Sequence, residues 1–143
     1  MTPLDTLDPA TVAEVSPVTT ACSALANPVV LDRFAHDSAA LTPDHHRILI
    51  AVARCILARR RTRTPANNLD IVGFASTTGS MDYNLELGRR RAQAVRTELR
   101  RTLERMLPGS SSGIVMNASS QGETNQVAGG AAANRRVAIF LPA

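Results

Sequence analysis

The chain has 143 residues, with sixteen basic and twelve acidic side chains, a formal net charge of +4 and no tryptophan. This length suits one domain, which can bury roughly two thirds of the surface of its unfolded chain. Aromatic residues make up only 3%, so small aliphatic side chains must build the core. The stacked aromatic platform of oligonucleotide-binding folds is not expected, and the composition argues against a nucleic-acid partner.

The charges are distributed unevenly along the chain. Residues 1–32 contain four acids and no arginine, whereas residues 33–143 contain eight acids and all sixteen basic residues, every one of them arginine. The arginine run over 59–63 is expected to be a solvated helix end, with phosphate contact as the alternative. Residues 1–28 carry four prolines and little hydrophobic periodicity. We expect them to form a loosely ordered, Pro-rich acidic leader that contributes little to folding, followed by one domain over 29–143.

The start of the sequence lacks the marks of export. A secretory signal needs a positive beginning and an apolar stretch of about 7–15 residues, and the first positive charge here is Arg33. No apolar run approaches the roughly 20 residues needed to span a bilayer, so no transmembrane segment is predicted. Two expectations stay open, a cytoplasmic protein and the mature or shortened form of an exported one.

Strand and helix patterns alternate from residue 29 onward. The Val-Val-Leu-Asp-Arg-Phe segment over 29–34 predicts the first strand. Thr42, Pro43 and Asp44 together predict a helix start, because threonine caps, proline fits the first helical position and an acid suits the positive end of the helix dipole. The helix is predicted to run to about residue 60, with a buried stripe of Ile48, Leu49, Val52, Cys55 and Ile56.

The second half of the chain adds three strands and one long helix. The strand predicted over 69–74 is apolar on both faces from Ile71 on, which is typical of a central strand. A helix is predicted from about 83 to 106, and strands over 114–118 and 136–141, joined by a loop rich in Gly, Ala and Asn. The order predicts an α+β fold in which two helices cover one face of a four-stranded sheet. The stripe expected to be buried in the long helix is Leu87, Val95, Leu99, Leu103 and Met106.

The cysteines and histidines do not indicate a metal site. Cys55 lies on an apolar helix stripe and is expected to be a small buried side chain, with a disulfide to Cys22 and a lipoprotein-type cleavage site at Cys22 as alternatives. His45 and His46 are neighbours that point about 100° apart on a helix, so they cannot chelate one metal together, and both are expected at a solvated helix start. No catalytic set is present in the sequence, and we predict no enzyme, cofactor or metal.

Arg91 has an unusual position in the long helix. It lies four residues after Leu87 and four before Val95, on the core side, where a charged side chain needs a polar partner or a solvated cleft. It is expected to point toward the carboxyl end of the central strand, where ligands often bind in α/β sheets. An arginine satisfied by loop carbonyls and an arginine that binds an anionic ligand are both open.

Three short motifs occur in order around Arg91. The first is Phe34–Leu41. The second is Gly73–Gly79 followed by Tyr83-Asn84, Leu87-Gly88 and Arg90-Arg91-Ala92. The third is Gln121-Gly122-Glu123 followed by Ala133–Val137. In sequence and spacing they resemble the OmpA-like, peptidoglycan-associated domain family, over about residues 29–143. The Leu-Gly-x-Arg-Arg-Ala run is closest to the peptidoglycan-associated lipoproteins. The resemblance implies a β-α-β-α-β-β two-layer sandwich with a mixed four-stranded sheet.

The resemblance also implies a ligand, the diaminopimelate of the peptidoglycan stem peptide. In the family an aspartate binds the ammonium group of diaminopimelate and an arginine binds its carboxylate. By position the arginine is Arg91, but the aspartate falls at Ser76, which carries no charge. Phe74 stands where the family has histidine or tyrosine, and Ala75 stands where it has threonine. In the first loop, the family aspartate is kept as Asp37. The candidate ligand-binding residues are His36, Asp37, Phe74, Ala75, Ser76, Asn84 and Arg91.

Two functions are therefore expected. The first is a peptidoglycan-binding module of the cell envelope or periplasm, weakened at Ser76 because a charge-assisted hydrogen bond is worth roughly 1.5–3 kcal/mol. The alternative is a repurposed OmpA-like structural or interaction protein with a protein partner, in a cytoplasmic or secreted assembly such as a contractile injection or secretion machine. Arg91, Asp37 and Asn84 favour the first function, whereas Ser76 and the missing export signal favour the second.

Overall fold

The computed structural model describes residues 21–143, and the prediction of a loosely ordered leader falls mostly on residues 1–20, outside this range. A helical turn over 21–23 comes first. The elements that follow are β1 (Val29–Leu31), α2 (Pro43–Arg59), β2 (Asn68–Phe74), α3 (Met81–Met106), the 3₁₀ helix η1 (Ser110–Gly113), β3 (Val115–Gly122), α4 (Gly130–Asn134) and β4 (Val137–Phe140). Their order confirms the predicted β-α-β-α-β-β arrangement, to which α4 adds one short helix.

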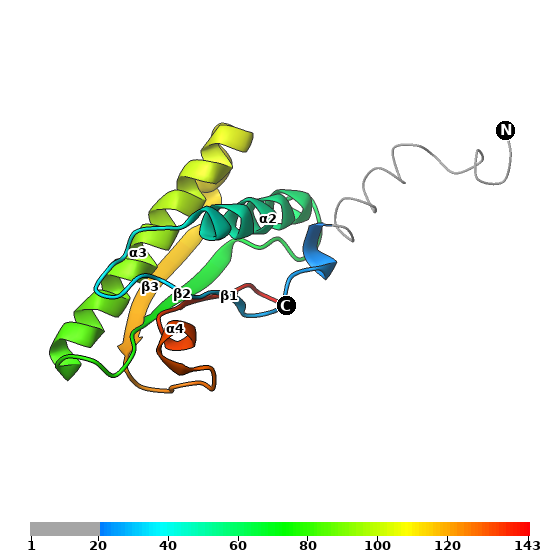
Figure 1. Ribbon diagram of the computed structural model, residues 1–143. Helices are drawn as coiled ribbons and strands as arrows, with labels where there is room; N and C mark the ends of the chain where they lie inside the picture. Colours follow the sequence, from blue (N-terminus) through cyan, green and yellow to red (C-terminus); the bar gives the residue numbers. More distant parts are fainter. Residues whose placement is uncertain (1–20) are drawn as a thin grey trace, which may run out of the picture.

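The four strands form one mixed sheet in the order β1-β4-β2-β3. β2 runs parallel to β3, and β4 runs antiparallel to both β1 and β2. Figure 1 shows α2 and α3 packed on the same side of this sheet, which confirms the predicted two-layer α+β fold. No helix within residues 21–143 is long and apolar enough to cross a membrane.

The core lies between the sheet and the two helices. The predicted helix stripes are buried at Leu49, Val52, Val95, Leu99 and Leu103, each fully inaccessible to solvent. They meet alternate strand residues that point toward the helices, among them Leu31, Leu69, Ile71 and Ile139. The prediction for Met106 is wrong, because it is the last residue of α3 and is 39% exposed.

Two strand boundaries differ from the prediction by more than one residue. β1 ends at Leu31 instead of residue 34, because Arg33 has a positive φ of 59° that turns the chain and Phe34 then points into the core. β3 continues to Gly122, beyond the predicted end at 118, although its last residues are polar. It is an edge strand paired only with β2 in the sheet, so its outer residues can be solvated while the pairing continues.

His45 is buried and not solvated as the sequence predicted. It is 2% exposed, and its Nδ1 accepts a hydrogen bond from the Thr42 N–H while the Thr42 hydroxyl accepts one from the His45 N–H. Because Nδ1 accepts, the ring proton is on Nε2, which donates to the Asp32 carbonyl at 2.5 Å. The histidine therefore fills the place of the acid in a capping box and also fastens the end of β1 to α2.

A disulfide joins Cys22 to Cys55 of α2, so the expectation of an unpaired Cys55 is wrong, although its burial at 3% is as predicted. Leu25 packs against the core, and the Asn27 side chain exchanges two hydrogen bonds with the backbone of Leu141. Residues 21–28 were assigned to the leader and nevertheless contact the domain. The sequence could not show this, because spacing alone does not bring two distant cysteines together.

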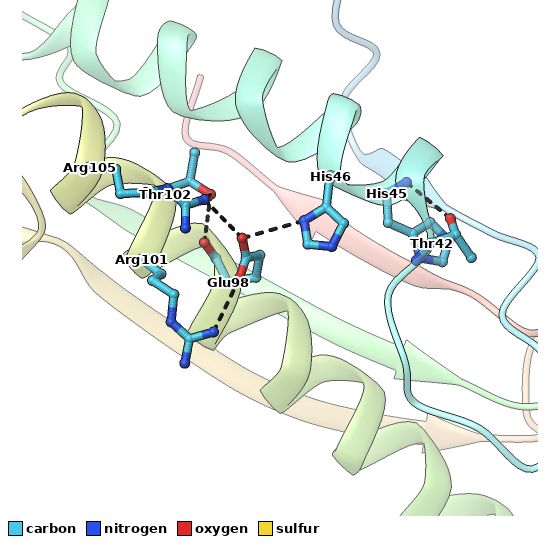
Figure 2. A network of polar contacts seen from close by, with 7 residues as sticks. All are labelled: Thr42, His45, His46, Glu98, Arg101, Thr102 and Arg105. Atoms are coloured by element: carbon cyan, nitrogen blue, oxygen red, sulfur yellow. Dashed lines mark hydrogen bonds and ion pairs between the residues drawn. The ribbon is translucent and has the colours of Figure 1, made fainter.

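One carboxylate connects the two helices. Figure 2 shows Glu98 of α3 facing His46 of α2. The Glu98 carboxylate oxygens lie 3.4 Å from Nδ1 of His46, 3.0 Å from the guanidinium of Arg105 and 3.4 Å from that of Arg101. Burial by itself would raise the pKa of the Glu98 carboxyl, but the hydrogen bond and charge of Arg105 and the charges of His46 and Arg101 outweigh it and lower that pKa. The carboxylate therefore stabilises the helix pair in its charged form.

Candidate ligand-binding site at one end of the sheet

Three loops leave the sheet at the same end, where β1, β2 and β3 finish, and this end is named the loop edge. β1 and β2 both run antiparallel to β4, and β2 runs parallel to β3, so β1, β2 and β3 all point the same way. Their carboxyl ends lead into the first loop (32–42), the second loop (75–80) and the closing loop (123–129). In Figure 1 these loops lie around the beginning of α3 and α4, at the kind of edge where α/β sheets bind ligands.

Two glycines let α3 approach β2 closely at this edge. A Cβ atom on Gly73 would lie 1.7 Å from the carbonyl oxygen of Gly88, and one on Gly88 would lie 2.2 Å from the Ser120 hydroxyl. Only a residue without a side chain fits at either position. The contact fixes the first half of α3 against the strand, and it places Arg91, one turn later, over the strand ends.

Arg91 connects the first loop to the end of β2. Its Nε donates to the Ser38 carbonyl at 2.8 Å, Nη2 to the Ala35 carbonyl at 3.1 Å and Nη1 to the Phe74 carbonyl at 3.0 Å. The side chain has no exposed surface. These bonds use three of the five N–H groups of the guanidinium. The structure thus shows the carbonyl partners that the sequence analysis offered as one interpretation.

The electrostatics of Arg91 differ from those of an ordinary surface arginine. Burial and then the positive charge of Arg135 lower its pKa to about 10, so it stays charged at neutral pH. Among residues 21–143, its hydrogen-bond partners are carbonyl dipoles and include no carboxylate. The edge of the sheet therefore holds a buried positive charge without a directly bonded negative one.

Asp37 and His36 form an exposed rim above Arg91. Asp37 has a positive φ of 54°, which aspartate tolerates better than most residues, and its Oδ1 accepts a hydrogen bond from the Tyr83 hydroxyl at 2.9 Å. Nε2 of His36 lies 3.4 Å from Oδ2, and both side chains are more than half exposed. Tyr83 was not among the predicted site residues, although the Tyr-Asn pair that contains it was recognised as a motif.

The other predicted residues are buried below the rim. Phe74, Ala75, Ser76 and Asn84 are between 1% and 6% exposed. The Ser76 hydroxyl lies 3.2 Å from the Thr78 hydroxyl of its own loop, and the Phe74 ring lies 3.7 Å below the guanidinium of Arg136. The structure brings all seven predicted residues to the same edge, but only the two on the rim are open to solvent.

The closing loop adds residues that sequence reasoning missed. The Ala75 N–H donates to the Gly122 carbonyl at 2.7 Å, and the Gln126 amide donates to the carbonyls of Ala75 at 3.0 Å and Glu123 at 2.7 Å. The Asn84 amide in turn donates to Oε1 of Glu123 at 3.4 Å. The available signal was the acidic residue directly after a strand parallel to β2, which must end at the same edge.

This arrangement presents groups that can bind a small charged ligand. It combines a buried guanidinium, the carboxylates of Asp37 and Glu123, and the Tyr83 hydroxyl, a set suited to charge-assisted hydrogen bonds with a small zwitterion. Within the described residues, no three side chains of His, Cys, Asp or Glu gather in a way that could hold a metal ion. We therefore interpret the edge as a recognition site.

Comparison with known proteins agrees with the geometry. The model of the OmpA family matches residues 33–139, while a search of curated protein sequences found no match. Similar solved structures include the peptidoglycan-associated lipoprotein from Burkholderia pseudomallei, with 23% identity, coverage of 78% of this chain and 88% of that one, and a TM-score of 0.59. The C-terminal domain of Helicobacter pylori MotB is 23% identical, with coverage of 78% of this chain and 82% of that one and a TM-score of 0.58. An outer membrane protein from Borrelia burgdorferi is 19% identical, with coverage of 83% of this chain and 94% of that one and a TM-score of 0.57.

Proposed function

The chain belongs to the OmpA family, and from this membership we propose that it is a non-catalytic module that attaches to peptidoglycan through the diaminopimelate of the stem peptide. One observation carries the proposal. Arg91 lies at the strand ends with two N–H groups beyond those bonded to carbonyls, next to the acidic rim of the first loop. The residues proposed to form the site are those predicted from the sequence, from His36 and Asp37 to Arg91.

The chemistry of the ligand fits this edge in part. The free end of diaminopimelate carries an ammonium group and a carboxylate, and the carboxylate suits the remaining N–H groups of Arg91. Because Arg91 has no exposed surface, the first loop must shift to admit the ligand. Ser76 itself supplies no charge for the ammonium group, and unless another acid takes its place the loss of one such contact weakens binding by roughly 10-fold or more.

The disulfide supports a location outside the cytoplasm. Cys22 and Cys55 are bonded, and disulfides persist in oxidising compartments such as the bacterial periplasm but are rare in the cytoplasm. Peptidoglycan lies in the same compartment. The periplasm or cell envelope is therefore the location that we propose.

A second candidate function has one observation in its favour. The three carbonyl bonds of Arg91 and the burial of Ser76 to 6% exposure also suit a closed loop end that stabilises the fold without a ligand. In that case the domain is a structural or interaction module with a protein partner in a larger assembly, such as a contractile injection or secretion machine.

Binding to sacculi and to a diaminopimelate-containing stem peptide distinguishes the two functions. For the first, purified sacculi pull down the protein, and calorimetry shows weak peptide binding that Ser76→Asp strengthens roughly 10-fold, less so as salt rises. Ser112→Asp adds the same charge at an exposed site in η1 and should change nothing. If neither the wild type nor Ser76→Asp binds, the peptidoglycan function is refuted and the second candidate is favoured. Tight binding by the wild type would show that Ser76 does not weaken the site.

A further inference from the structure

The ends of β2 and β3 occupy equivalent places at the sheet edge. The two strands are parallel neighbours, Phe74 pairs with Gly122, and the Gly122 carbonyl accepts the Ala75 N–H at 2.7 Å. Glu123 therefore follows β3 where Ala75 and Ser76 follow β2. A carboxylate is missing at the end of β2 and is present at the end of the strand beside it.

The Glu123 side chain points back toward the same site. Its Oε1 accepts a hydrogen bond from Asn84, a residue of the first turn of α3, at 3.4 Å. That bond is long and its donor is a neutral amide, so it satisfies little of the carboxylate. Within residues 21–143 no arginine or histidine forms an ion pair with Glu123, whereas Glu98 has three such partners. Its charge is free to meet a cation from outside the chain.

The loop that carries Glu123 is fastened on both sides. The Gln126 amide bridges the carbonyls of Glu123 and Ala75, and the Arg136 guanidinium donates to the Asn125 carbonyl at 3.0 Å while its face lies against the Phe74 ring. These contacts fix the backbone of the closing loop against the second loop. A side chain whose backbone is held in this way has less freedom to lose, so binding a cation costs less conformational entropy.

We propose that Glu123 is the residue that binds the ligand's ammonium group in place of the aspartate absent at Ser76. The inference rests on the proposed peptidoglycan function and names the anionic half of the site. Asp37, the acid of the rim, is already bonded to the Tyr83 hydroxyl and lies beside His36. The ammonium group lies between the closing loop and the first turn of α3, and the ligand carboxylate faces Arg91.

The test is calorimetry on the full chain with two peptides. One is a diaminopimelate-containing stem peptide, and the other is the same peptide with the free side-chain amine acetylated. Glu123→Gln keeps the size of the side chain and an oxygen for Asn84, so the domain should fold and melt as the wild type does. It should weaken binding of the free-amine peptide roughly 10-fold or more and leave the acetylated peptide unchanged. Asp70→Asn removes one charge from an exposed position in the middle of β2 and should affect neither.

Each other outcome has a defined meaning. If Glu123→Gln binds both peptides as the wild type does, or if Asp37→Asn alone produces the amine-dependent loss, the assignment to Glu123 is overturned while the peptidoglycan function stands. If the wild type binds neither peptide, the function fails and the inference fails with it. Ser76→Asp in the Glu123→Gln background should restore the preference for the free amine, and its failure to do so would place the ammonium group elsewhere.

Discussion

The helix layer and the loop edge stabilise buried charge in opposite ways. In the helix layer, formed by α2 and α3, Glu98 is surrounded by the basic side chains of His46, Arg101 and Arg105, and the Cys22–Cys55 disulfide adds a covalent link to α2. At the loop edge, Arg91 is surrounded by three backbone carbonyls. A charge with ionic partners is complete within the fold, whereas a charge held by dipoles alone retains the capacity to attract an anion. This contrast supports the proposal that the loop edge binds the ligand.

Replacing Arg91 should destabilise the protein more than any other single change discussed. Arg91→Met leaves the carbonyls of Ala35, Ser38 and Phe74 without their donor, and each unsatisfied buried group costs about 1–3 kcal/mol. We expect a loss of about 3 kcal/mol or more in the free energy of unfolding, measured by urea denaturation.

A matched control is available on the same helix. Arg90→Met removes a neighbouring exposed arginine and should change the free energy of unfolding by less than about 0.5 kcal/mol. Hydrogen exchange should accelerate over 35–38 in the Arg91 variant only. A loss below about 1 kcal/mol for Arg91→Met would show that the loops do not depend on the guanidinium.

Much of the fold could be predicted because its signals are local. The Thr42-Pro43-Asp44 start and the leucine and valine stripes depend on spacing along one helix, and they gave both helices to within a few residues. The burial of His45 was not predicted because it depends on a hydrogen bond to the Asp32 carbonyl. Asp32 lies thirteen residues earlier in the chain, directly after the end of β1. Periodicity carries no information about such partners.

The site could be predicted only in part for a related reason. Position in the helix was enough to single out Arg91, because a charge on the core side is unusual in any fold. Glu123 was noted only as part of the closing motif and Gln126 was not noted, because their place beside Ser76 depends on the parallel pairing of β2 with β3. The disulfide could be offered only as an alternative, since nothing local shows that residue 22 lies against α2.

Breaking the disulfide tests the covalent half of the comparison. Cys22 and Cys55 are 33 residues apart in sequence, and loss of a bridge of this kind typically costs about 2–4 kcal/mol. Cys22→Ser combined with Cys55→Ala should therefore lower the melting temperature by several degrees. Removing residues 1–20, which the sequence predicts to contribute little, should lower it far less. Equal melting of oxidised and reduced wild type would show that the bridge adds nothing to the helix layer.

The ionic half of the comparison predicts a smaller effect that depends on pH. Glu98 is only 10% exposed, but Arg101 and Arg105 are more than half exposed, so Glu98→Gln should cost about 1 kcal/mol at pH 7. Because the folded pKa lies below the ordinary value of 4.5, this stabilisation is fully present above pH 4.5 and is lost as the pH falls through the lowered value. Urea unfolding of both proteins at several pH values should show a difference that closes in acid.

Glu86→Gln provides the control for that difference. Glu86 pairs with Arg89 on the same helix, but both side chains are about half exposed, so its loss should change the free energy of unfolding by less than about 0.5 kcal/mol. Within the part of the chain that the structure describes, Arg91 has no carboxylate partner whose protonation could remove its hydrogen bonds, and the loss caused by Arg91→Met should persist in acid. If that loss instead closed with the Glu98 loss at low pH, the loop edge would also depend on an ionised acid, and the contrast between the two regions would fail.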